Sequence, residues 1–240
     1  MTLDDVRARL REHASPQAAL GAQRYFRTGP GEYGEGDVFI GVRVPDIRRV
    51  AKEFRALPLD AVAELLRSPV HEERLLALLL LVGAYAKGDG ALRGRVFELY
   101  MGHTRYVNNW DLVDSSAAGI VGAYLAGGDR SLLDRLAASQ SLWERRIAVV
   151  ATLHFIRRGE FADTLRVAAL LLRDRHDLIH KVVGWMLREV GKRDRAAEET
   201  FLREHCRAMP RTMLRYAVER FPEPLRRAYL RGEPPAPGAG

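Results

Sequence analysis

The sequence has a single cysteine, no long apolar segment and no strand-like alternation, and each absence excludes a class of protein. With only Cys206 present, no intrachain disulfide can form. The most apolar run, Leu75 to Ala86, is shorter than the about 20 residues needed to cross a bilayer and is interpreted as a buried helix. Asp4 and Asp5 lie where a secretory signal has a basic and then an apolar segment. We therefore expect an intracellular, cytoplasmic protein without a membrane segment.

Familiar catalytic and cofactor motifs are also missing. No Gly-x-Ser-x-Gly elbow occurs, and the glycine-rich residues 28–37 are not followed by Gly-Lys-Ser/Thr, which disfavours nucleotide triphosphate binding. His176 and His180 have the spacing of a metal-ligand pair, but no glutamate lies between them as a zincin helix requires. Cys206 is interpreted as a small buried hydrophobic residue rather than a nucleophile. We expect neither a metal nor a cofactor.

Apolar residues recur at helical spacing along most of the chain, and this pattern predicts an all-α protein. Pro45 suits a first helical turn, where its missing N–H is not needed, and Asn109 and Asp177 are expected N-caps. The glycine-rich residues 28–37 are expected to form a loop that continues into extended chain over residues 38–45. Helix starts are predicted near Leu3, Gln17, Pro45, Leu59, Val70, Gly90, Asn108, Ser131, Leu142, Phe161, Asp177, Arg195, Pro210 and Pro222.

A tryptophan-containing block recurs along the chain. Trp110 is followed by Trp143 after 33 residues and by Trp185 after a further 42, which is close to the period of about 40 residues in HEAT-type helix pairs. We therefore predict a curved α-solenoid of HEAT-like helical repeats, built as a single domain over residues 1–230 with one concave face. Residues 231–240 are rich in proline, glycine and alanine and are predicted to form a disordered tail.

The excess of basic charge is confined to one part of the chain. The formal net charge is +7; residues 1–140 hold 18 basic and 18 acidic side chains, whereas residues 141–240 hold 20 and 13. A one-sided excess of this kind indicates a surface for a polyanion such as nucleic acid.

Trp110 and Asp114 lie one helical turn apart, so an indole and a carboxylate share a face. An ordinary interpretation packs the tryptophan in the core and leaves the carboxylate as a cap or in solvent. The residues from Ser115 to Gly119 are small, which would keep the carboxylate within reach of a ligand. The pair is therefore a candidate for chemistry.

Arg145 and Arg146 follow Trp143 closely, and two interpretations of them stay open. They are either two surface arginines that solvate an exposed face or a guanidinium fork that binds phosphate oxygens.

Lys181, Trp185 and Arg188 occupy one helical stripe, where a core helix would carry leucines. A basic and aromatic stripe suits contact with sugar-phosphate and stacking on bases. Gly184 lies beside it and would let another backbone or a ligand approach closely. The basic surface is extended by Arg211 and Arg215.

Four motifs occur in register: residues 39–45 (FIGVRVP), 110–114 (WDLVD), 143–146 (WERR) and 180–189 (HKVVGWMLRE). Together they resemble the DNA alkylation repair family of HEAT-like-repeat glycosylases, the AlkD type. The similarity extends from about Tyr25 to Leu230, and residues 211–222 also resemble the closing helix of that family. The resemblance implies an α-solenoid that holds duplex DNA on its concave face and releases positively charged alkylated purines, such as 3-methyladenine and 7-methylguanine.

The resemblance also implies roles for individual residues. Asp114 matches the catalytic carboxylate of the family, and Trp110 and Trp185 match aromatic residues beside the damaged nucleotide. Arg146 matches an arginine near the DNA backbone, and Tyr25 matches a family tyrosine in position. The expected partner is duplex DNA with alkylated bases, bound by a monomer without a small-molecule cofactor. The expected DNA-binding residues are Arg146, Arg145, Lys181, Arg188, Tyr25, Arg211 and Arg215.

One departure concerns the lesion. Where some glycosylase members have paired phenylalanines shortly before the Lys-x-x-Gly-Trp motif, this chain has Asp177 and Leu178. The preferred lesion is therefore left open.

The chemistry suits a single carboxylate. Glycosidases normally use two, one of which protonates the leaving group. A purine alkylated at N7 or N3 already carries positive charge and leaves as a neutral molecule, so Asp114 would need only to stabilise the oxocarbenium-like sugar and orient water. The faces of Trp110 and Trp185 would favour positive charge by ~0.5–2 kcal/mol each.

The alternative is a helical-repeat protein that binds DNA or protein without catalysis. A carboxylate that faces DNA phosphates is repelled by them and contributes nothing to such a scaffold. Asp114 is therefore the residue that distinguishes the two interpretations.

Overall fold

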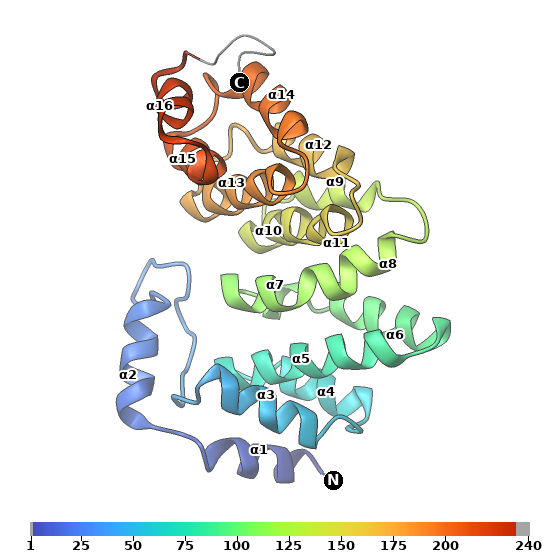
Figure 1. Cartoon of the computed structure of the whole chain (residues 1–240). Helices are drawn as coiled ribbons and strands as arrows, with labels where there is room; N and C mark the ends of the chain where they lie inside the picture. The colour runs from blue at the N-terminus through green and yellow to red at the C-terminus, as the bar shows by residue number, and fades with distance from the viewer. Residues whose placement is uncertain (1, 234–240) are drawn as a thin grey trace. The chain divides into compact units, whose positions relative to one another are not determined.

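The computed structural model describes residues 2–233, whose regular structure is almost entirely helical (Figure 1). Across these residues no strand forms, and the β-structure is one isolated parallel bridge between Val38 and Val70. The predicted all-α class is therefore confirmed. The chain divides into two compact units, residues 1–124 (unit 1) and residues 125–240 (unit 2). The single domain over residues 1–230 and its concave face stay predictions, and residues 234–240 of the predicted tail lie outside the described residues.

Unit 1 is organised around the long helix α5, which packs against α3, α4, α6 and α7. The apolar run predicted to be a buried helix lies in α5, where Leu76, Leu78 and Leu81 have no solvent contact. Hydrophobic burial along α5 therefore holds its neighbours together. The elements are α1 (Leu3–Arg11), α2 (Pro16–Tyr25), α3 (Val44–Glu53), α4 (Leu59–Leu66), α5 (His71–Lys87), α6 (Gly90–Met101), a 3₁₀ turn (Thr104–Tyr106), α7 (Trp110–Ala117), a π-helical segment (Ala118–Gly122) and the start of α8 (Ala123–Leu125).

Unit 2 has a corresponding central helix, α13, which packs against α10, α12, α14 and α15. Its buried side chains include Val183, Met186 and Leu187, and they alternate at helical spacing with the basic and aromatic stripe. The elements are α9 (Leu132–Ala137), α10 (Leu142–Ala151), α11 (Leu153–Ile156), α12 (Ala162–Leu170), α13 (Asp177–Gly191), α14 (Arg195–His205), α15 (Arg211–Ala217), a 3₁₀ turn (Val218–Arg220) and α16 (Glu223–Arg231).

Each predicted helix start falls within two residues of an observed one. The Asn109 side chain caps α7 as predicted, because its oxygen accepts the Trp110 N–H at 2.8 Å. The cap predicted at Asp177 is displaced by one residue: His176 caps α13, and its Nδ1 accepts the Leu178 N–H at 3.1 Å. The short helices α8 and α11 were not anticipated, because each is only a few residues long and has no start signal of its own.

The described residues contain no helix with the length and apolar content that a membrane crossing requires. Cys206 is buried, as predicted from its residue type.

Gly184 allows α15 to approach α13 closely in unit 2. A Cβ at this position would lie 2.3 Å from the Met213 carbonyl oxygen and 2.5 Å from the Tyr216 Cβ on α15. The predicted close approach is therefore that of another backbone. By contrast, a Cβ at Gly83, within α5, would meet nothing within 4 Å.

We expect Gly184→Ala to lower the free energy of unfolding by about 1–3 kcal/mol, because the added methyl group must push α15 away from α13. Gly83→Ala is the matched control and should raise the free energy of unfolding by about 0.5–1 kcal/mol, because alanine favours the helix and meets open space. Urea titrations of the two variants measure both effects. Equal stability of the two variants would contradict the close packing of α13 on α15.

Candidate functional site

A column of aromatic rings leads from the interior of unit 1 to Trp110. Phe39 stacks on the His71 imidazole with centroids 4.5 Å apart, and Phe26 stacks on Phe39 at 5.1 Å. The Trp110 indole stacks on Phe26 at 5.3 Å, and Tyr25 meets it edge-on at 5.8 Å. Phe39 and His71 are buried, Phe26 and Trp110 are half-buried, and Tyr25 is 67% exposed. The indole therefore rests on a rigid stack with an exposed tyrosine at its edge.

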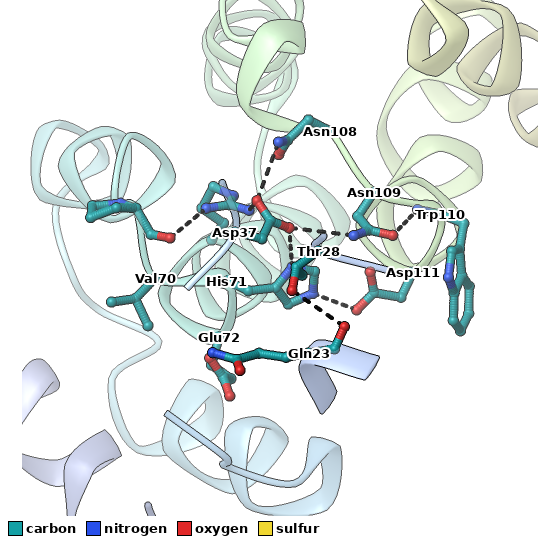
Figure 2. Close-up of polar contacts among 12 residues, drawn as sticks. Gln23, Thr28, Asp37, Val70, His71, Glu72, Asn108, Asn109, Trp110 and Asp111 are labelled. Carbon is teal, nitrogen blue, oxygen red and sulfur yellow. Dashed lines mark hydrogen bonds and ion pairs between the residues drawn. The ribbon is translucent and has the colours of Figure 1, made fainter. Parts of the chain in front are cut away.

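A buried network of charges surrounds His71, the innermost ring of this column, and Figure 2 shows its hydrogen bonds and ion pairs. His71 is held between two carboxylates, with Nδ1 3.0 Å from Asp37 Oδ2 and Nε2 2.8 Å from Asp111 Oδ2. Asp37 also accepts a hydrogen bond of 2.5 Å from Arg74. Two cationic side chains thus meet two carboxylates, which offsets the cost of removing these charges from water.

The extended chain covers residues 38–43, because α3 already begins at Val44, and it is anchored by another carboxylate on α5. The buried Glu72 side chain accepts the backbone N–H groups of Ile40, Gly41 and Val42 at distances of 2.7–3.3 Å. Gly41 has a φ of +79°, and a Cβ there would lie 2.1 Å from the Ser15 carbonyl oxygen. This anchoring places Phe39 in the ring column and explains why glycine occurs at this point of the motif.

The start of α7 is fixed by the same network. The buried Asn109 amide donates to Asp37 at 3.3 Å, and Asn108 donates to the other oxygen of that carboxylate at 3.3 Å. Asp111, in the first turn of α7, faces His71. Asn108, Asn109 and Asp111 therefore hold the chain on both sides of Trp110, and these contacts fix the direction of α7.

Asp114 lies one turn further along α7 and is half-buried. Its charge acts on Tyr100 of α6: burial raises the pKa of the Tyr100 phenol, and the nearby Asp114 carboxylate raises it further. The Tyr100 hydroxyl is 3.1 Å from the Ser116 hydroxyl, which ties α6 to α7 beside this carboxylate. The candidate catalytic group therefore lies on a helix held from two sides.

The electrostatics of the network favour a charged imidazole. Burial lowers the pKa of His71, but the hydrogen bonds that the imidazole donates to Asp111 and Asp37 outweigh this effect, so the pKa lies above the ordinary value of 6.5. Burial raises the pKa of Asp37, but the hydrogen bond from His71 and the charge of Arg74 bring it below the ordinary value of 3.8. Protonated His71 is thus stabilised between ionised partners.

In unit 2, the predicted stripe on α13 is present, and each of its members has an acidic partner. Lys181 lies 2.6 Å from an Asp177 oxygen. The half-buried Trp185 indole donates to Glu189 at 3.2 Å. Arg188 forms an ion pair with Glu219. The stripe is therefore electrostatically balanced, and a phosphate would have to compete with these carboxylates.

The other predicted DNA-binding arginines have different surroundings. Arg145 lies 2.6 Å from an Asp174 oxygen and also donates hydrogen bonds to two backbone carbonyl groups. All of these acceptors belong to unit 2. Arg146 is buried and donates to the Leu178 carbonyl at 2.8 Å. Arg211 donates to the Leu230 carbonyl. Their roles in DNA binding stay predictions, and the contacts show that all three also join elements of unit 2.

Arg215 is exposed and contributes to a recess in unit 2 with a volume of about 440 Å³. The recess brings together Lys181 and Arg215 from the predicted set. Its remaining lining residues are Asp177, Thr212, Tyr216, Glu219 and Arg226.

The two histidines considered as metal ligands are engaged separately. His176 caps α13, and His180 Nε2 lies 2.6 Å from the Asp174 carbonyl oxygen. Within residues 2–233, no cluster of three His, Cys, Asp or Glu side chains could hold a metal ion.

Sequence reasoning missed the residues that support Trp110. The available signal was the run from His71 to Arg74, four consecutive polar residues at the start of the most apolar helix, all of which are buried. Buried charged residues require partners, so Asp37 and Asp111 could have been sought as those partners.

Comparisons with known proteins agree with this architecture. The all-α chain of stacked helices matches the family model described as DNA alkylation repair enzyme over residues 6–221. The chain therefore belongs to the DNA alkylation repair enzyme family. A solved structure titled as a predicted DNA alkylation repair enzyme from Enterococcus faecalis is similar in fold, with a TM-score of 0.67 and 17% identity. The similarity covers 88% of this chain and 98% of that one. Among curated proteins no match is found.

We predict that His71 makes stability depend on pH in a direction set by its raised pKa. Its contribution is fully present below pH 6.5 and is lost as the pH rises through the higher pKa of the folded state. In the wild type, the free energy of unfolding should therefore decline as the pH rises above 6.5. In His71→Gln this decline should be absent. Urea titrations at several pH values measure that slope.

His154→Gln serves as the control of opposite sign. Burial lowers the pKa of His154, so this residue contributes a loss of stability as the pH falls below 6.5, and its replacement should remove that loss. Parallel profiles of wild type and His71→Gln on the alkaline side would exclude a charged His71 in the network.

Proposed function

We propose that this protein is a DNA glycosylase that hydrolyses the N-glycosidic bond of positively charged alkylated purines in duplex DNA. Asp114 is the catalytic carboxylate, and Trp110 and Trp185 are aromatic partners of the damaged nucleotide. Membership of the DNA alkylation repair enzyme family supports a role on DNA. The reaction and its substrates, 3-methyladenine and 7-methylguanine, are the proposal.

The observation that carries this proposal is the preorganisation of α7. Trp110 rests on the ring column, Asp111 is bound to buried His71, and Asp114 follows one turn later on the same helix. Catalytic groups are effective when the residues around them hold their position before substrate binds. A helix with only a structural role can be held by apolar packing alone. The start of α7 is held in addition by a buried charge network, which supports a role that requires precise positioning.

The bond changes need one carboxylate. The bond between C1′ of the deoxyribose and the alkylated purine breaks, and its electron pair goes to the base, which leaves as a neutral molecule. The positive charge that develops on the sugar is stabilised by Asp114. Water then adds at C1′ on the opposite face and releases a proton. Because the base was charged before the reaction, no side chain has to protonate it, unlike in ordinary glycoside hydrolysis.

The charge distribution supports binding to a polyanion. Residues 141–240 carry the whole excess of basic side chains, and Lys181 and Arg215 line one recess in unit 2. Contacts with phosphates give affinity that is independent of sequence and falls with salt. A repair enzyme requires this property, because damage occurs at any sequence.

We expect Asp114→Asn to reduce release of 7-methylguanine from methylated duplex DNA by about a hundredfold or more, because the amide cannot stabilise the developing positive charge. Affinity for undamaged duplex DNA should stay nearly unchanged, since Asp114 does not bind phosphate. Single-turnover release assays and fluorescence anisotropy measure these two quantities.

Asp60→Asn is the matched control, because it removes an exposed carboxylate from α4 of the same unit. It should retain wild-type release. Equal release by Asp114→Asn and wild type would refute the mechanism and favour a protein that binds DNA without catalysis.

The charge of the leaving group decides which damaged bases this site can release. Wild-type protein should release cationic 7-methylguanine but not neutral damaged bases such as hypoxanthine or 1,N6-ethenoadenine, because these need a general acid to leave. Duplexes of one sequence, each with a single defined lesion, test this by chromatography of the released base. Comparable release of a neutral base would show that a proton donor acts in the site.

A further inference from the structure

The turn that ends α2 holds an arginine in an unusual conformation. Arg27 has a φ of +51°, the one positive φ of a non-glycine residue within residues 2–233. The Thr28 N–H donates to the Gln23 carbonyl at 3.2 Å, and the Arg27 N–H donates to the Arg24 carbonyl at 3.4 Å. These two bonds form a Schellman motif, whose left-handed position is normally occupied by glycine because a Cβ is disfavoured there.

The backbone of this turn is held independently of the Arg27 side chain. Besides the two bonds of the motif, the Gly34 N–H donates to the Arg27 carbonyl at 3.1 Å. Gly34 packs so closely that a Cβ there would lie 2.4 Å from the Phe26 carbonyl oxygen. The same turn would therefore form with glycine at position 27, and the arginine is retained against the local conformational preference.

Packing and ion pairing do not account for the arginine. Arg27 is exposed, and across residues 2–233 its guanidinium has no hydrogen bond or ion pair. The two glutamates of the following loop are bound to the backbone of that loop: Glu32 accepts the Gly29 N–H and Glu35 accepts the Gly31 N–H, each at 2.9 Å. A residue in a disfavoured conformation, with an exposed guanidinium that makes no hydrogen bond or ion pair within residues 2–233, indicates an external ligand.

The position of the turn identifies the ligand. Tyr25 and Phe26, the two residues before Arg27, both contact the Trp110 indole. The carbonyl groups at the end of α2 carry partial negative charge and would repel a phosphate if the turn ended in glycine. A guanidinium reverses that repulsion and binds phosphate oxygens through paired hydrogen bonds.

We propose that Arg27 is a DNA-binding residue that contacts a backbone phosphate close to the nucleotide held at Trp110. This inference rests on the proposed function and adds a phosphate contact from unit 1, whose net charge gives no indication of one. Arg27 would contact the DNA backbone rather than a base, so this contact would not depend on the DNA sequence.

The test uses Arg27→Gly, because the binding role and a structural role predict opposite outcomes. Glycine relieves the left-handed backbone, so the melting temperature should stay unchanged or rise by about 2–4 °C. Affinity of the full-length protein for an undamaged duplex should fall about fivefold or more, and the slope of log affinity against log salt should be shallower by about 1. Arg27→Lys should recover part of the affinity because it restores the charge.

Arg55→Gly is the matched control. Arg55 is also an exposed arginine of unit 1, but its backbone is not left-handed, so this variant should melt at or below the wild-type temperature and bind DNA with nearly wild-type affinity.

Two results would overturn the inference, and they are distinguishable. If wild type binds duplex DNA but Arg27→Gly binds it with equal affinity and salt slope, Arg27 does not contact phosphate, while the proposed glycosylase function is untouched. If wild type itself shows no salt-dependent binding to duplex DNA, both proposals fail.

Discussion

The salt-bridged imidazole of His71 is the interaction on which the arrangement of unit 1 depends. Its two carboxylate partners come from different segments, Asp37 from the loop after α2 and Asp111 from the first turn of α7. Charges buried away from water are tolerated only when paired, so these segments have one relative position that satisfies all of them. A displacement of α7 would leave a buried charge without its partner. Because Trp110 and Asp114 lie on α7, this constraint also fixes their positions.

Each unit places its candidate residues on helices that are secured by apolar burial elsewhere. In unit 1, α7 packs on α5, whose Leu76, Leu78 and Leu81 are fully buried. In unit 2, α13 is itself the central helix, and its buried face is opposite the stripe of Lys181, Trp185 and Arg188. Long helices with one buried face hold side chains more rigidly than loops do. The same hydrophobic burial that stabilises the fold therefore also orients the polar residues.

Glycine and arginine illustrate opposite uses of local backbone geometry. At Gly41 and Gly184 an added methyl group would collide with a neighbouring backbone, so packing alone explains the residue. At Arg27 glycine would fit the backbone better than the residue that is present, so packing cannot explain it. A glycine required by close packing is explained by its neighbours within the protein. A residue that keeps an unfavourable backbone conformation without such a neighbour indicates an interaction with a ligand outside the protein.

Helical periodicity by itself determined the all-α class and the helix starts, because the apolar residues of a helix repeat within a few positions along the chain. Local spacing likewise placed Trp110 and Asp114 on one face of α7. Only the tertiary structure decided what surrounds them. The partners of His71 lie 34 and 40 residues away, and no local pattern encodes which buried charges will meet. It also decided that Arg145 and Arg146, basic in sequence, are bound within unit 2, because accessibility depends on packing between helices distant in sequence.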